Sequence, residues 1–339
     1  MRLSIIGLKL FPTLLLTLTG WGWVWNSIPP TTLVAAMPGP VGSNEDEASS
    51  GGNSTGVTIN HSPGLDRLNF LRSLANLPPV WENLQFNQNL QLHCQWIVNN
   101  NDLAHSETPG SPWFTDAGNL AAEQSNLTAS SAYLTITKAV DGFITAPFHA
   151  LGMLDPRLQQ TGFGLFNSAN AVGDFHSAAG VNVLGACNGP TDGIVFPVIW
   201  PANGKTVPFT KYPGNEYPDP LTSTPGFTSP AGLPLILQFA GQTPIVSGFS
   251  LVQRGGAAQE LAEIDARNYT NPSASCQSLV RSILGGRHAV ILIPRLPLRP
   301  GATYDASIVA NGVITHWSFK VDAAAVDRYP VSAQVLWPL

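Results

Sequence analysis

The chain has 339 residues and a net charge of −5, and only 11% of its residues are charged beside 32 glycines and 29 prolines. Few charges and many turn-forming residues argue against long charged helices and favour strands joined by loops. The sequence has no run of lysine or arginine, which argues against a nucleic-acid partner bound through clustered positive charge. The length exceeds that of one average domain, so we expect two domains.

Residues 1–36 have the pattern of a signal peptide or a membrane anchor. Arg2 and Lys9 supply positive charge, and an apolar run follows from Leu10 to Trp25. Small residues at 34–36 offer a cleavage site for a signal peptidase. The apolar run is short for a membrane span of about 20 residues, which favours cleavage over anchoring. Either outcome predicts an extracellular or cell-surface protein, which contacts a membrane only through this segment if it is uncleaved.

Residues 37–64 are rich in glycine, serine, asparagine and acidic groups, as in the string SNEDEASSGGNSTG. Such a segment buries too little apolar surface to offset the entropy lost on ordering. We therefore expect a flexible linker between the targeting segment and the folded part of the chain.

Helical periodicity follows the linker. Leucines 65, 68, 71 and 74 recur at the spacing of one helix face, which places Arg72 on the other, polar face. Pro78-Pro79 ends this first predicted helix. Two more helices are expected over Asn87–Asn99 and Ser131–Ala146, and Pro147 ends the last of them.

Strand patterns dominate the remainder of the chain. Short apolar or alternating runs separated by glycine and proline predict strands at 161–166, 180–184, 194–200, 233–239, 244–252, 289–294, 304–310 and 314–321. Asn311-Gly312 has the composition of a hairpin turn between the last two. The expected fold class is α+β, with an α-β-α layered domain over 65–198, a loop-rich connection over 199–230, and a smaller immunoglobulin-like β-sandwich over 231–339.

Cysteines and histidines are the side chains whose chemistry stands out. Three cysteines cannot form a closed disulfide framework, although Cys187 and Cys276 could pair. Four of the seven histidines fall in the predicted α-β-α domain, and imidazole is the commonest metal ligand. They are His93, His105, His149 and His176. No HExxH-like spacing joins any of them into a local metal motif.

Three ordered blocks carry a family resemblance: LNFLRSLANLPPV, NQNLQLHCQWIVNNNDLAHSE and AVDGFITAPFHALGMLDPRLQQTGFG. Together they resemble bacterial members of the CAP superfamily, the cysteine-rich secretory protein, antigen 5 and pathogenesis-related 1 type. The resemblance covers the central segment and implies a CAP-type α-β-α sandwich. It also implies a shallow cleft lined by two histidines and two glutamates, which holds a divalent metal in some members.

The cleft residues of the family can be matched one by one to positions of this sequence. His105 in AHSE matches the first family histidine, and His149 matches the histidine of the SPxH block. Glu123 lies where the family has Gly-Glu-Asn, and His176 lies near the last family histidine without the HYTQVVW-like string. The second family glutamate has no match on the third predicted helix, where Asp141 is the nearest acid. Glu107, two residues after His105, is a candidate substitute.

Each of these residues also has a plain structural interpretation. His105 can cap a helix end, His149 can satisfy backbone groups after Pro147, and His176 can be solvent-exposed. Glu123 can lie at an ordinary helix start, where a carboxylate suits the helix dipole. If His105, His149, His176 and Glu123 do meet, imidazoles with one carboxylate favour zinc with a water in the open position. No cofactor is otherwise indicated.

Three functions follow from these alternatives. The first, which we favour, is a non-enzymatic binding module for a cell-wall, glycan or lipid ligand, because the cleft set is incomplete and an adhesion-like domain follows it. The second is a metal-assisted hydrolase in which Glu123 or Glu107 is the general base. The third is a structural protein of the cell envelope, held away from the membrane by the linker.

Overall fold

A computed structural model describes residues 62–325 and 334–336. The predicted targeting segment and nearly all of the predicted linker lie outside these described residues. Within the described part, no helix has both the length and the apolar character that a membrane span requires.

Three of the helices form where the periodicity predicts them, and three form where it does not. The α-helices are α1 (Pro63–Ser73), α2 (Leu84–Asn100), α3 (Asp116–Glu123), α4 (Ile136–Thr145), α5 (Pro147–Met153) and α6 (Ala274–Gly286). The side chains of Ser62 and Asn83 cap α1 and α2 by accepting hydrogen bonds from free backbone N–H groups. The predicted end at Pro147 is confirmed, because α4 stops at Thr145 and Pro147 begins α5. Helices α3, α5 and α6 were not predicted.

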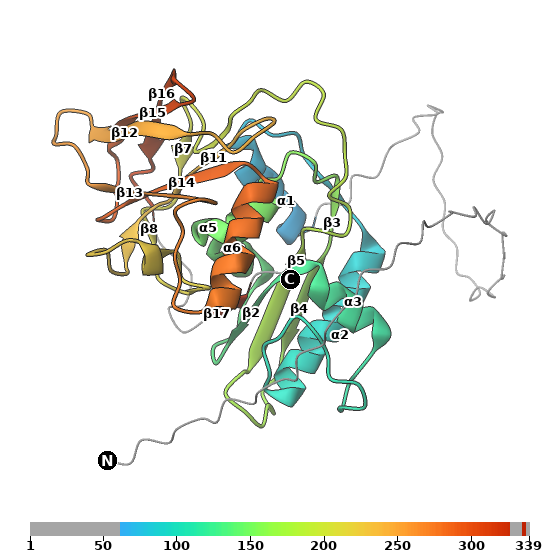
Figure 1. The fold of residues 1–339 in the computed structure, drawn as a ribbon. Coiled ribbons are helices and arrows are strands. Elements are labelled where there is room, and N and C mark those ends of the chain that lie inside the picture. The colour runs from blue at the N-terminus through green and yellow to red at the C-terminus, as the bar shows by residue number, and fades with distance from the viewer. Residues whose placement is uncertain (1–61, 326–333, 337–339) are drawn as a thin grey trace, which may run out of the picture. The chain divides into compact units, whose positions relative to one another are not determined.

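A five-stranded sheet has the order β4 (Phe163–Asn167), β5 (Ser177–Asn182), β2 (Ser125–Ser130), β17 (Gln334–Leu336) and β9 (Glu216–Tyr217). Helix α2 packs on strands β4 and β5 (Figure 1). A side-chain carbon at Gly164 would lie 2.6 Å from the backbone oxygen of Leu90 on α2. Glycine at this position therefore lets the helix approach the sheet closely.

Two four-stranded sheets follow in the C-terminal part. One has the order β13 (Leu261–Asp265), β14 (Ala289–Pro294), β11 (Leu235–Gln238), β6 (Val198–Trp200). The other has the order β12 (Val246–Gln253), β15 (Thr303–Ala310), β16 (Val313–Val321), β7 (Thr206–Val207). The predicted Asn311-Gly312 hairpin joins β15 to β16, with Ala310 opposite Val313. The remaining elements are short: β1 (Trp81–Glu82), β3 (Gln160–Thr161), β8 (Lys211–Tyr212), β10 (Ala231–Gly232) and the 3-10 helix η1 (Pro220–Ser223).

Helices and several antiparallel sheets confirm the α+β class, while the immunoglobulin-like sandwich stays a prediction. The predicted domain boundaries also stay a prediction, but the segments that they separate share one hydrophobic core. Leu68 and Leu71 of α1 belong to the same buried cluster as Val290 and Ile291 of β14. Within it, the ring of Phe148 on α5 meets that of Tyr269 edge-on, with centroids 5.5 Å apart.

Arg72 is the clearest departure from the helical pattern. The sequence places it on the polar face of α1, but its side chain is fully buried, so this prediction is wrong. Its Nε donates to the carbonyl of Pro78 at 3.0 Å, and its Nη1 donates to the carbonyls of Met153 at 2.7 Å and Asp155 at 3.1 Å. Burial lowers the pKa of Arg72 to about 10, so the guanidinium is still charged at neutral pH. The side chain thereby joins the end of α1 to the end of α5.

Replacing Arg72 tests this joint. Arg72→Met keeps an unbranched side chain but leaves three buried carbonyls without their donor, and should lower the free energy of unfolding by about 3 kcal/mol or more. Arg254→Met is the matched control, because Arg254 pairs with Asp305 on the surface and should change stability by about 0.5 kcal/mol or less. Denaturant unfolding measures both. Equal, small effects would show that the buried guanidinium contributes nothing.

Candidate functional site

His149, the best match to the family's SPxH histidine, lies on α5, where its side chain and that of Glu216 are buried and hydrogen-bonded to each other. The Oε1 atom of Glu216 accepts hydrogen bonds from the backbone N–H of His149 at 2.9 Å and from its Nδ1 at 2.6 Å. Both side chains are fully buried. The ring of Phe143 on α4 stacks on the imidazole with a centroid distance of 5.6 Å. Glu216 comes from β9 in the predicted loop-rich connection, where no sequence motif singled it out.

The surroundings of Glu216 disfavour charge. Burial raises the pKa of Glu216, and the hydrogen bonds from His149 offset only part of that effect. The Oε2 atom of Glu216 is buried and has no hydrogen-bond partner among the described residues. The Tyr212 hydroxyl accepts from the Glu216 backbone N–H at 3.3 Å and donates to Asp219 at 3.2 Å. The pair therefore lies inside the protein, where it fixes β9 against α5.

His105 and Glu107 occupy the loop ahead of α3. The Nδ1 atom of His105 lies 2.8 Å from the carbonyl oxygen of Ala122. A carbonyl only accepts, so this ring nitrogen carries a proton. Glu107 is buried, and its carboxylate lies 3.0 Å from Nδ1 of His93 and accepts from the backbone N–H of Thr115 at 2.7 Å. Glu107 therefore holds the start of α3 against α2.

Glu123 and His176 lie at less enclosed positions. Glu123 is the last residue of α3, not a residue at a helix start as the plain interpretation assumed, and its side chain is exposed. It accepts a hydrogen bond from Asn119 at 3.1 Å. His176 is half-buried directly before β5, and its backbone N–H donates to Ser130 at 2.9 Å. The acid nearest the missing family glutamate, Asp141, accepts from Nε of Arg67 at 2.6 Å.

These placements do not fit a zinc centre. Over residues 62–325 and 334–336, no three or more histidine, cysteine, aspartate or glutamate side chains are grouped so that they could hold a metal ion. The proposed set of His105, His149, His176 and Glu123 is therefore not assembled as a ligand cage.

The cysteines do not pair. Cys94, Cys187 and Cys276 are all free thiols, so the disulfide considered between Cys187 and Cys276 is absent. The Sγ of Cys276 donates to the hydroxyl of Tyr217 at 3.3 Å. Burial raises the pKa of the Cys187 thiol to about 12, and the negative charge of Asp155 contributes to this shift. The thiol is therefore protonated and unreactive at neutral pH.

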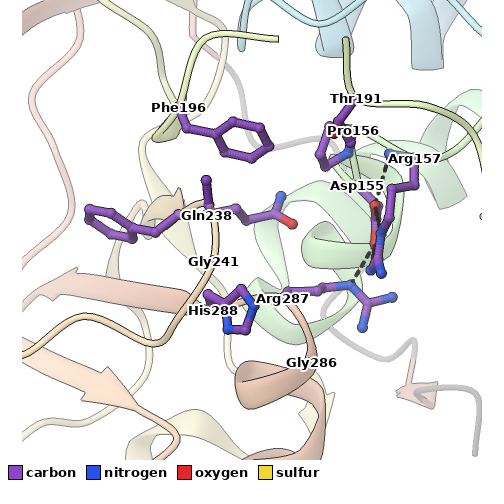
Figure 2. Close-up of a pocket in the computed structure, with 12 residues that line it drawn as sticks. Asp155, Pro156, Arg157, Thr191, Phe196, Gln238, Gly241, Gly286, Arg287 and His288 are labelled. Carbon is purple, nitrogen blue, oxygen red and sulfur yellow. Dashed lines mark hydrogen bonds and ion pairs between the residues drawn. The ribbon is translucent and has the colours of Figure 1, made fainter.

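A cavity of about 220 Å³ lies where the end of α5 meets the ends of β11 and α6 (Figure 2). Asp155 lies in its wall, fully buried, and is held by two arginines. Arg157 binds it through Nε at 2.9 Å and Nη2 at 2.8 Å, while Nε of Arg287 lies 3.2 Å away. Gln238 of β11 donates to the carbonyl of Leu154 at 2.8 Å. No sequence motif pointed to this cavity, because its walls come from separate segments of the chain, residues 155–157, 191–196, 238–241 and 286–288.

Comparison with known proteins identifies the central segment. The family model for the cysteine-rich secretory protein family, CAP, matches residues 65–177. A search of curated proteins finds no match to the chain. The family match confirms the resemblance of the three sequence blocks, and residues 65–177 form a CAP segment that covers about a third of the chain. Glu216, Gln238 and Arg287 all lie beyond the matched residues.

The pair of His149 and Glu216 makes a prediction about stability. Glu216→Gln retains an oxygen that can accept both hydrogen bonds from His149 and should change the free energy of unfolding by about 1 kcal/mol or less. Glu216→Ala removes the acceptor from a buried imidazole and leaves a cavity, and should cost about 3 to 5 kcal/mol. Thermal unfolding of both variants distinguishes them. If alanine were tolerated as well as glutamine, the pair would have no structural role.

A second buried acid predicts a pH dependence. The pKa of Glu263 is raised from its ordinary 4.5 to about 7. Burial is the main cause, and the negative charge of Asp265 is the second. Between these values the native state holds the proton more tightly than the unfolded chain does, so this group's contribution to stability falls as the pH rises and is smallest above 7. Glu263→Gln should therefore raise the melting temperature at about pH 8.5 and leave it unchanged at about pH 4. A gain of the same size at both pH values would contradict the raised pKa.

Proposed function

We propose that this chain is an exported CAP-superfamily protein that acts as a non-enzymatic binding module for a cell-envelope, glycan or lipid ligand. The CAP identity of the central segment supports the general class, because family members are often secreted. The pattern of residues 1–36 supports export.

The burial of the candidate catalytic groups carries the non-enzymatic part of the proposal. A general base must come within about 3 Å of a substrate or of a water that substrate can reach. His149 and Glu216 are fully buried and bind one another, and Glu107 is buried against His93. Glu123 is accessible and accepts a hydrogen bond from Asn119. Glu107 and Glu216, the two glutamates that are bonded to a histidine in this set, are therefore the ones that solvent does not reach.

A binding role needs less from the same residues. A site that only binds requires a concave surface with a few convergent polar groups, and no proton transfer. The cavity beside Asp155 combines charged, amide and aromatic side chains in that way. An envelope ligand also agrees with a low surface charge, which disfavours nucleic acid as a partner.

The test uses the secreted form together with His105→Ala. We expect no stoichiometric zinc in either form by elemental analysis, and no release of products from peptidoglycan or peptide substrates. Sedimentation with purified cell-wall sacculi, and with vesicles of anionic and neutral lipids, should show saturable binding to one of them that a chelator does not reduce. About one zinc per chain that is lost in His105→Ala, or hydrolysis abolished by the chelator, would contradict the proposal and support a metal-assisted hydrolase.

A further inference from the structure

The cavity in Figure 2 joins the CAP segment to the C-terminal part, and four separate parts of the chain form its walls. Residues 155–157 follow α5, residues 238–241 follow β11, and residues 286–288 end α6. Phe196 and Thr191 close one side. Gln238 is the last residue of β11, and Asp155 is fixed by hydrogen bonds from Arg157, so these groups are in place before any ligand arrives.

The charges in the wall do not balance. Asp155 is the one carboxylate in the cavity wall, where Arg157 and Arg287 supply two guanidinium groups. Both oxygens of Asp155 already accept hydrogen bonds from Arg157, and Oδ2 is also close to Arg287. The neighbouring Cys187 thiol is protonated at neutral pH and adds no negative charge. One positive charge in a partly enclosed space remains in excess and attracts an anion.

Two further features favour a ligand in which a negatively charged oxygen group is attached to an apolar group. The Nδ1 atom of His288 is buried and has no hydrogen-bond partner among the described residues. The side chain of Arg157 is 43% exposed, so the guanidinium meets both the cavity and solvent. Guanidinium forks and imidazole nitrogens bind the oxygens of carboxylates and phosphates. Phe196 and Phe239 add flat apolar surface beside them.

The volume limits what can enter. Pockets that enclose a whole drug-sized ligand have about 300 to 1000 Å³, and this cavity has about 220 Å³. It can therefore take the end group of a larger molecule but not the whole of it. We propose that this cavity binds the terminal carboxylate or phosphate group of an envelope ligand, through Arg157 and His288. This inference rests on the proposed binding function and gives it a site and a ligand chemistry.

Gly286 allows the cavity to be blocked without touching the groups that bind. A side-chain carbon built at Gly286 meets no atom within 4 Å, and its backbone is outside the left-handed region. Gly286→Leu should therefore fold normally and place its side chain in the cavity. Ser282→Leu is the matched control, because it adds an exposed leucine one turn earlier on α6.

The probes are acetate, N-acetylalanine, inorganic phosphate and methyl phosphate, titrated into the full chain and followed by calorimetry and by the melting temperature. We expect one class, carboxylates or phosphates, to bind saturably and to raise the melting temperature. Gly286→Leu should weaken that binding at least about tenfold, while Ser282→Leu leaves it unchanged. Arg157→Gln should weaken it similarly, and Arg254→Gln, at a surface ion pair, should not.

Saturable binding that survives in both Gly286→Leu and Arg157→Gln would overturn the site, as would the absence of saturable binding by all four probes. If Gly286→Leu or Arg157→Gln fails to fold, His288→Asn decides the question, because it removes the buried Nδ1 atom and leaves Asp155 with both of its arginines. The two proposals fail separately in these experiments. Loss of envelope binding with intact binding of the small anions contradicts only the envelope function, whereas envelope binding that is unchanged in Gly286→Leu contradicts only this site.

Discussion

The buried carboxylate of Asp155 is the group around which the described part of the chain is organised. Burial alone would raise its pKa, but the hydrogen bonds from Arg157 and the charge of Arg287 outweigh that effect and lower it. The carbonyl of the same residue accepts from Arg72. An isolated buried charge would be strongly unfavourable, so the arginines and the carboxylate must be brought together for any of them to be buried.

Those arginines come from distant parts of the sequence. Arg72 lies on α1 and Arg157 follows α5, both in the CAP segment, whereas Arg287 directly follows α6 in the C-terminal part. The charge cluster therefore requires the two parts to fold against each other. The hydrogen-bonded pair of His149 and Glu216 likewise holds the CAP segment against β9. The ring contact of Phe148 with Tyr269 joins the same two parts through apolar surface. The C-terminal part thus packs against the CAP segment through buried charged, polar and aromatic side chains.

This arrangement explains what the sequence could and could not predict. Leucines at regular spacing locate α1, and alternating residues with an Asn-Gly turn locate β15 and β16, because these signals are local. Helix α6 had a local signal as well, since Val280, Ile283 and Leu284 are buried at helical spacing. It was missed among strand patterns rich in glycine. Arg72 was misplaced because periodicity assumes that a charge faces solvent, and only the carbonyls of Pro78 and Met153 reverse that assumption.

The candidate site was predictable only to the extent that the family motifs fix it. His105 and His149 were found by resemblance, but the partner of His149 lies 67 residues further along the chain. No spacing rule connects His149 to Glu216, or Arg157 to Arg287, because each pair is made by tertiary packing. The sequence could therefore list the ionisable groups of the CAP segment, and it could not tell which of them are used internally.

We infer that the CAP segment and the C-terminal strands are one cooperative unit joined at Asp155. Differential scanning calorimetry of the full chain tests this inference. We expect a single transition whose calorimetric and van't Hoff enthalpies agree, and which moves as a whole to lower temperature in Arg287→Ala. Two separable transitions, of which Arg287→Ala shifts only one, would show that the parts fold independently and would contradict it.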